Sequence, residues 1–261
     1  MYLSKCYAQL SADKIENTAF CTEAGIMVQQ LQPTAVDSDW LYPESDGKPL
    51  SDNTIQFRLI TTIQGGIDAL FAANPNVFVA GDLLWYPEEA VEGVSQSQAP
   101  DVMVVFGRPK GDRRSYKQFL EENIAPQVIF EILSKSNTSK EMLAKFNFYE
   151  RHNVEEYYLY DPAKNALKGW LKQGKNLTPI DTIEGWISPR LGCRFETAKG
   201  SLELYRPDGQ RMETYVETSK RAEQEAKARR DAIPQLLALG LSVEQVAEAL
   251  NLSVEEVNHR Q

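Results

Sequence analysis

Apolar residues in the middle of the chain fall into two short runs, and each run carries one carboxylate. The first run begins with Asp101 in the segment APDVMVVFG, and the second contains Glu131 within residues 127–133. Pro126 and Ser134 bound the second run, whose β-branched and aromatic residues predict a strand buried on both faces. An ionised carboxylate in such a strand is costly unless it is paired, hydrogen-bonded or bound to a metal, so Glu131 requires an explanation.

Two stretches with helical periodicity flank these runs. Apolar residues recur at three- and four-residue steps between residues 53 and 73, which predicts an amphipathic helix. A Thr-x-x-Glu capping box at Thr138 predicts a second helix over residues 139–152. On this helix Lys145 lies at the edge of the apolar face, within reach of a neighbouring strand, whereas Lys140 points to solvent.

Shorter apolar or alternating runs, separated by turn residues, predict further strands. They lie at residues 77–86, with a bend at Gly81-Asp82, and at residues 154–160, 167–171, 180–187 and 202–205. The last three would extend the sheet or form a β meander at its edge.

The composition changes at about Glu217. Residues 217–231 read ETSKRAEQEAKARRD, which predicts a solvated helix that Pro234 interrupts. Ser242 and Ser253 are the expected N-caps of short helices in LSVEQVAEALNLSVEEV, a stretch that resembles a helix-turn-helix. Its second helix is short and acidic, so we favour self-association or a packed cap over DNA contact.

These patterns predict three parts in the chain. Residues 1–44 form an N-terminal extension, in which Met27 is a plausible alternative start, residues 45–215 form the main domain, and residues 216–261 form the helical tail.

Composition narrows the class of protein. The 261 residues are 42% hydrophobic, enough for a full core, and 28 basic against 37 acidic residues give a net charge of −9. Such a chain has no general attraction to nucleic acid or anionic membranes. Three cysteines without a CxxC pair and two histidines argue against disulfides and structural zinc. The absence of a long apolar run and of a signal pattern predicts a reduced, cytoplasmic protein.

One segment is basic although the chain as a whole is acidic. Five cations lie between the two carboxylate runs with only Asp112 to offset them: Arg108, Lys110, Arg113, Arg114 and Lys117. This basic loop is the best candidate for contact with a phosphate. The alternative is a solvated hairpin tip.

Asp101 and Glu131 on adjacent strands would form an all-oxygen site suited to Mg²⁺ or Mn²⁺. A neighbouring lysine would orient or deprotonate the attacking water, or stabilise charge on a phosphate. This combination is typical of phosphodiester hydrolysis.

Four motifs together resemble the Uma-two family of predicted bacterial endonucleases. The motifs are PDV at 100–102, E-I-L-S at 131–134, Lys145 with Tyr149 four residues later, and EEYYLYDP at 155–162. The family belongs to the PD-(D/E)XK restriction-endonuclease-like superfamily, and the resemblance spans roughly residues 45–205.

The resemblance implies an α+β fold in which helices flank a mixed sheet, and it implies DNA cleavage. It also implies a divalent metal, Mg²⁺ or Mn²⁺, held by Asp101, Glu131 and the backbone carbonyl of Ile132.

One position departs from the superfamily pattern. A lysine is expected two residues after Glu131, but Leu133 stands there. Either the lysine role has moved to Lys145 or Lys135, or the site is silent, and we favour Lys145. The competing hypothesis is a non-catalytic module that binds nucleic acid or a protein partner through the basic loop and the tail. We also expect a homodimer, since the charged helix precedes amphipathic helices and two nearby cuts in a duplex need two active sites.

Overall fold

The computed structural model describes residues 17–21, 27–31, 41–47 and 49–259. By its internal contacts the chain divides into two units. The first unit consists of Met1–Pro43 and Ala90–Ser95, and the second of Glu44–Glu89 and Gln96–Gln261.

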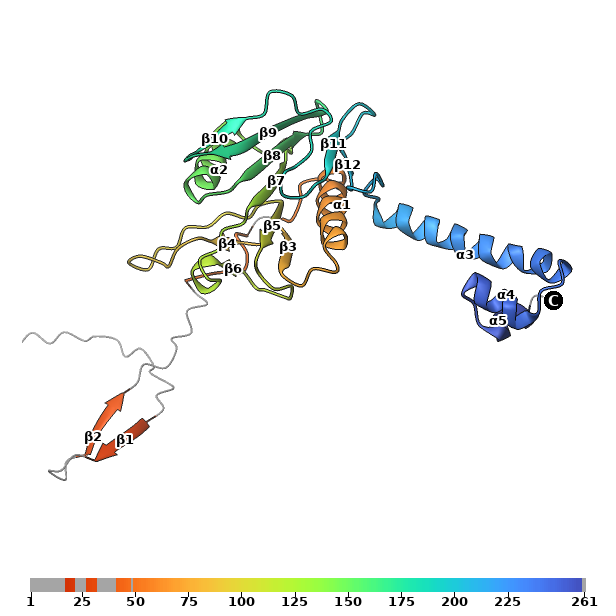
Figure 1. Cartoon of the computed structure of the whole chain (residues 1–261). Helices are drawn as coiled ribbons and strands as arrows, with labels where there is room; N and C mark the ends of the chain where they lie inside the picture. Colours follow the sequence, from red (N-terminus) through yellow and green to blue (C-terminus); the bar gives the residue numbers. More distant parts are fainter. Residues whose placement is uncertain (1–16, 22–26, 32–40, 48, 260–261) are drawn as a thin grey trace, which may run out of the picture. The chain divides into compact units, whose positions relative to one another are not determined.

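The first unit contains an antiparallel hairpin. Strand β1 (Asn17–Cys21) pairs with β2 (Met27–Leu31), as Figure 1 shows. In the same unit the backbone N–H of Ala90 donates to the Tyr42 hydroxyl at 2.8 Å. Weak periodicity in the sequence did not predict this hairpin, and much of the expected N-terminal extension lies outside the described residues.

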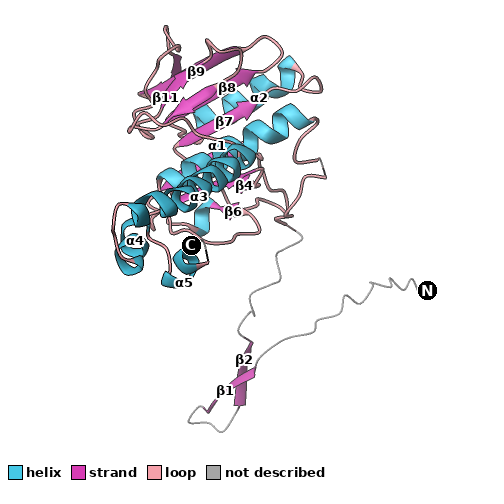
Figure 2. Cartoon of the chain, turned by 90° about the vertical axis from the view of Figure 1, so that its right-hand side faces the viewer, coloured by secondary structure: helices cyan, strands magenta, loops and turns pink. Residues whose placement is uncertain are grey.

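The second unit is built on a six-stranded mixed sheet with the order β10-β9-β8-β7-β5-β3. Within this sheet β7 and β8 pair in parallel, and the other neighbouring strands are antiparallel. Figure 2 shows β7, β8 and β9 side by side. The strands are β3 (Val77–Gly81), β5 (Val102–Phe106), β7 (Val128–Ile132), β8 (Glu156–Asp161), β9 (Ala166–Gln173) and β10 (Asn176–Pro179).

Helix α1 (Thr54–Leu70) covers one face of this sheet. Its buried residues Ile60, Ile63 and Ile67 pack on valines of the sheet, and the hairpin formed by β11 (Arg194–Glu196) and β12 (Glu203–Tyr205) contributes to the same core. The three- and four-residue spacing of apolar positions therefore predicted the correct helix and its buried side.

Helix α2 (Ser139–Arg151) covers the opposite face and connects the parallel strands β7 and β8 (Figure 1). Thr138 caps it with the predicted capping box. On this side the short parallel pair β4 (Trp85–Tyr86) and β6 (Tyr116–Lys117) completes the core. The 3₁₀ turn η1 (Gln118–Leu120) follows β6, and its Gln118 accepts a hydrogen bond from the Trp85 indole N–H. An α+β fold with helices on both faces of a mixed sheet is thus confirmed.

The prediction of a strand at residues 180–187 is wrong. Only Ile187 in this stretch forms an isolated bridge, with Arg194. The side chains of Ile180 and Ile183 pack over Gly169 of β9, where a Cβ would meet both of them. Apolar side chains without backbone pairing gave the false strand signal.

The C-terminal tail consists of α3 (Tyr215–Ala238), α4 (Val243–Leu250) and α5 (Val254–Asn258). Ser242 and Ser253 are the N-caps, as predicted, and α4 and α5 lie together near the end of α3 (Figure 2).

The predicted interruption at Pro234 is wrong, because α3 continues through it. Pro234 is followed by Leu236 and Leu237, which pack with the fully buried Ile233 against α4 and α5. This packing offsets the missing backbone donor of the proline.

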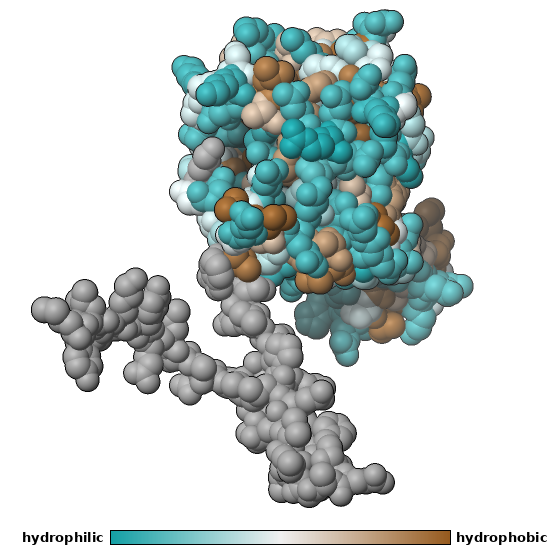
Figure 3. All heavy atoms as spheres, turned by 90° about the vertical axis from the view of Figure 1, so that its left-hand side faces the viewer, coloured by the Kyte–Doolittle hydropathy of each residue, from teal (hydrophilic) through white to brown (hydrophobic). Residues whose placement is uncertain are grey.

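The surface shown in Figure 3 is mainly hydrophilic, with hydrophobic residues scattered over it. In the described part of the chain, no helix combines the length and apolarity that a membrane span requires.

Candidate active site

The two carboxylates predicted from the sequence meet at one end of the sheet. Val102 of β5 pairs with Phe130 of antiparallel β7, so Asp101 lies beside Glu131. Side chains alternate along a strand, and both carboxylates belong to the set that faces α2. Asp101 is 7% exposed and Glu131 is 3% exposed, so folding removes both from water.

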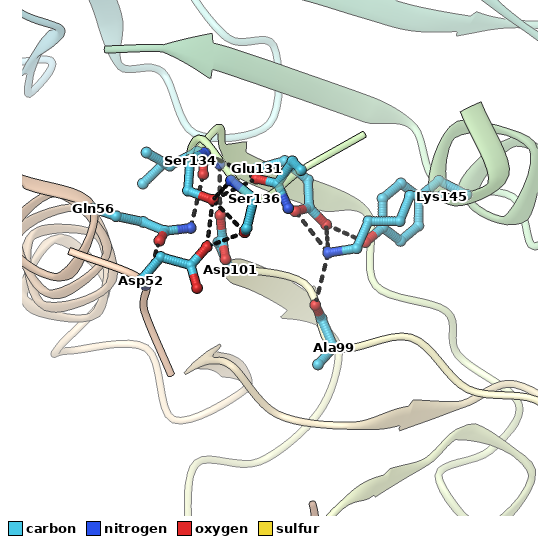
Figure 4. A network of polar contacts seen from close by, with 11 residues as sticks. Asp52, Gln56, Ala99, Asp101, Glu131, Ser134, Ser136 and Lys145 are labelled. Atoms are coloured by element: carbon cyan, nitrogen blue, oxygen red, sulfur yellow. Dashed lines mark hydrogen bonds and ion pairs between the residues drawn. The ribbon is translucent and has the colours of Figure 1, made fainter. Parts of the chain in front are cut away.

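Helix α2 supplies the partners of Glu131. The Lys145 ammonium donates to both carboxylate oxygens of Glu131, each at 2.8 Å, and to the Ala99 carbonyl at 3.2 Å (Figure 4). One turn later, the buried Tyr149 hydroxyl also donates to Glu131. The predicted reach of Lys145 is confirmed, and Lys140 is exposed as expected. Tyr149, which the apolar pattern of α2 explains as core packing, is also a polar member of the site.

The electrostatics of the cluster differ from those of a surface ion pair. Burial and, after it, the adjacent Glu131 raise the pKa of Asp101 to about 8, against the opposing effects of Lys145 and the Ile132 N–H. Burial lowers the pKa of Lys145, but the carboxylates of Glu131, Asp101 and Asp82 together outweigh this effect and the net shift is upward. Burial also raises the pKa of Tyr149 well above its ordinary value, so its hydroxyl remains a donor.

The backbone of Ile132 connects this cluster to α1. Its N–H donates to Asp101 Oδ2 at 2.5 Å, and its carbonyl accepts from the Gln56 amide at 2.9 Å. Gln56 in turn accepts from the Asp52 N–H at 2.9 Å. We did not predict Gln56 from the sequence. The sequence does contain a signal for it: Gln56 lies four residues before Ile60, so it is a polar residue on the apolar face of α1.

Asp82 is a further carboxylate at this end of the sheet. Its backbone has φ 48, in the left-handed region that aspartate tolerates, which agrees with the bend expected there. Burial and the nearby Asp46 raise its pKa to about 6, although Lys145 opposes the shift. Asp82 therefore forms the bend between β3 and β4, and its carboxylate also belongs to the candidate site.

Several of these groups line a pocket of about 310 Å³. Its wall includes Asp52, Gln56, Asp82, Asp101 and Lys145. The loop after β7 closes one side, because the hydroxyls of Ser134 and Ser136 both donate to Asp52 (Figure 4).

The oxygen groups at this end of the sheet fit a small hard cation, and one of them, Asp101, lines the pocket. Within the described residues, no three His, Cys, Asp or Glu side chains are grouped so that they could hold a metal ion. Mg²⁺ does not need three, because it usually takes one or two carboxylates and completes its shell with water and substrate phosphates. Asp101, Glu131 and the Ile132 carbonyl are all oxygen donors. The carbonyl has a second lone pair besides the one that Gln56 occupies.

The basic loop is largely compensated by carboxylates. Arg108 and Arg113 share Glu121, at 2.8 Å and 2.7 Å. The remaining pairs are Arg108 with Glu122, Lys110 with Asp68, and Arg114 with Glu44. Contact between this loop and a phosphate stays a prediction. For Arg108, Lys110, Arg113 or Arg114 it would mean exchanging a carboxylate partner for the phosphate.

Comparison with known proteins relates this site to a family. The family model described as "Uma2: Putative restriction endonuclease" matches residues 34–244. Among solved structures, "a putative nuclease belonging to DUF820 from Anabaena variabilis" is similar, with a TM-score of 0.38 and 14% identity, over 63% of this chain and 77% of that chain. No curated protein gave a match. Because the family model spans well over half of the sequence, the chain belongs to the Uma2 family.

Proposed function

We propose that this protein is a metal-dependent endonuclease that hydrolyses DNA phosphodiester bonds. The observation that carries the proposal is the buried pair Asp101 and Glu131 at neighbouring strand ends, with Lys145 held against Glu131. Membership of the Uma2 family supports a nuclease as the general class.

Asp101, Glu131 and the Ile132 carbonyl would hold Mg²⁺ or Mn²⁺, which supplies charge neutralisation for the phosphate and activation of water. A divalent cation would also relieve the cost of two desolvated like charges, which the raised pKa of Asp101 reflects.

Lys145 takes the role of the lysine that the superfamily pattern would place at Leu133. It approaches Glu131 from α2 rather than from β7, and its side chain is 21% exposed at the pocket wall. From there its ammonium would orient the attacking water or stabilise negative charge on the phosphate. Gln56 and Asp52 hold the Ile132 carbonyl in place and act as positioning residues.

A second candidate function is a nuclease-fold module that binds DNA without cutting it. The contact that favours it is the complete engagement of Lys145, whose ammonium donates to Glu131 and to Ala99. A lysine fixed in this way would serve as a structural counter-ion.

Cleavage of supercoiled plasmid with Mg²⁺ or Mn²⁺ tests the proposal. We expect the parent protein to nick the plasmid, and Glu131→Gln and Lys145→Met each to reduce the rate by at least about 100-fold. Lys140→Met is the matched control, because Lys140 is an exposed lysine on the same helix.

Stability must be measured in parallel, because Lys145→Met leaves Glu131 buried without its counter-ion, which typically costs about 3–5 kcal/mol. The double variant Glu131→Gln/Lys145→Met removes both charges and should recover part of this loss. Equal nicking by the parent and the folded double variant would end the enzyme proposal, and DNA binding without any nicking would favour the second candidate.

A further inference from the structure

A second, more apolar groove adjoins the candidate active site. Its volume is about 980 Å³, against about 310 Å³ for the catalytic pocket. The two share part of their walls, namely Asp52, Ser136, Asn137 and Met142. A ligand bound in one would therefore continue into the other.

The walls of the groove come from three elements. Ile55 lies in the first turn of α1, Met142 on α2, and Leu159 on β8, with Pro162 just beyond that strand. Leu133, at the position where the superfamily pattern expects a lysine, also lines this groove. The replacement of a charged residue by leucine thus makes the wall next to Glu131 apolar.

The charged groups along the groove are mostly compensated. Lys164 pairs with Asp161 at 3.1 Å, and Asp52 accepts hydrogen bonds from two serines. Lys135 is exposed at the groove and forms no ion pair within the described part of the chain. The groove therefore offers apolar contact together with one available cation.

We infer that this groove binds an unpaired nucleotide next to the bond that is cut, so that the substrate is DNA with a single-stranded segment. The inference rests on the proposed nuclease function. A paired duplex presents phosphates and sugars to a protein and keeps the faces of its bases stacked inside. An unpaired base exposes an apolar face that side chains can cover, while its phosphate lies within reach of a lysine.

We infer a nucleotide as the occupant because the groove is continuous with the catalytic pocket. The shared residues place the groove directly beside Asp101 and Lys145, where a scissile phosphate would lie. A base that enters the groove would fix the register of the strand relative to these groups.

Two neighbouring residues of α2 provide a matched test. Met142 lines the groove, whereas Leu143 is 60% exposed and lines neither cavity. Met142→Gln and Leu143→Gln introduce the same neutral, polar side chain on the same helix. Ile55→Gln on the opposite wall is a second variant, with the exposed Ile187→Gln as its control.

The measurement is equilibrium binding of a short fluorescein-labelled DNA strand and of its duplex to the full chain, by fluorescence anisotropy with Ca²⁺ in place of Mg²⁺. We expect the parent to bind the single strand about tenfold more tightly than the duplex. Met142→Gln and Ile55→Gln should each weaken single-strand binding about tenfold. Ile55→Gln should leave duplex binding unchanged, because Ile55 does not line the catalytic pocket. The two control variants should match the parent.

Failure of this inference differs from failure of the proposed function. If the plasmid is nicked but both groove variants bind the single strand like the parent, the groove does not hold a base and the nuclease proposal stands. If duplex and single strand bind equally well, the preference for an unpaired strand is wrong. If the parent neither binds nor cuts DNA, both proposals fall.

Discussion

Asp101 is a carboxylate that folding removes from water while a second carboxylate lies beside it. Burial and Glu131 raise its pKa to about 8, from 3.8 in the unfolded chain. The folded protein therefore retains a proton on this group that the unfolded chain releases at lower pH. Its contribution to stability is complete below about pH 4 and is lost as the pH rises through about 8.

The difference in the pKa of Asp101 between the folded and the unfolded chain predicts how Asp101→Asn changes stability in the absence of divalent metal. The amide still accepts from the Ile132 N–H but does not ionise, so the variant should gain on the order of a few kcal/mol over the parent at pH 9. The gain should vanish near pH 4. Urea unfolding in EDTA at several pH values measures it, with the exposed Asp112→Asn as control.

Mg²⁺ offers an independent check on the same residue. It should raise the unfolding temperature of the parent at pH 8 more than that of Asp101→Asn, because a ligand that binds only the folded state stabilises it. A stability difference between the proteins that is the same at pH 4 and pH 9 would contradict the raised pKa.

In the C-terminal tail, packing between helices overrides the low helix propensity of one residue. Pro234 lies inside α3, where it lacks the N–H that would bond to the Arg230 carbonyl and its ring crowds that carbonyl. Ile233 is fully buried against α4 and α5, with Leu236 and Leu237 beside it. The small core that these helices share keeps the last turn of α3 in place.

Pro234→Ala should therefore stabilise the tail, by up to about 3 kcal/mol, because it restores the missing hydrogen bond without touching the buried side chains. Hydrogen exchange would show slower exchange for amides of α3 and α4, while those of β7 and β8 remain unchanged. Unchanged exchange throughout α3 would mean that the helix already accommodates the proline at no cost.

The charge of the chain limits how it can bind DNA. The chain carries a net charge of −9, and Arg108, Lys110, Arg113 and Arg114 of the basic loop are paired with carboxylates. These four cations would have to give up their carboxylate partners before they could displace counterions from DNA. The expected homodimer stays a prediction, and it would double the number of sites without changing this balance at each of them.

Duplex binding should therefore depend weakly on salt. The slope of log K against log[NaCl] should be no steeper than about −2, whereas five phosphate contacts from the loop would give about −4.5. Anisotropy titrations of a labelled duplex over a series of NaCl concentrations, with Ca²⁺ present, measure the slope. A slope near −4.5 would show that the loop exchanges its carboxylate partners for phosphates on binding.

The local pattern of the sequence determined most elements of the main unit. Helical periodicity predicted α1, the capping box at Thr138 predicted α2, and short apolar runs predicted β5, β7 and β8. These signals are local, because a cap or a period depends on residues within one or two turns of each other. The same signals predicted Asp101, Glu131 and Lys145 as the residues of the candidate site. The resemblance that rests on these motifs predicted the Uma2 family, to which the chain belongs.

Which polar groups meet depends on how the elements pack and pair. Strand register set Asp101 beside Glu131, and packing of α1 on the sheet brought Gln56 to Ile132 across 76 residues. It also paired the basic loop with Glu121, which the sequence alone could not show. Register and ion pairing depend on residues far apart in the chain, and the free energy that selects them is that of the assembled core rather than of any one segment.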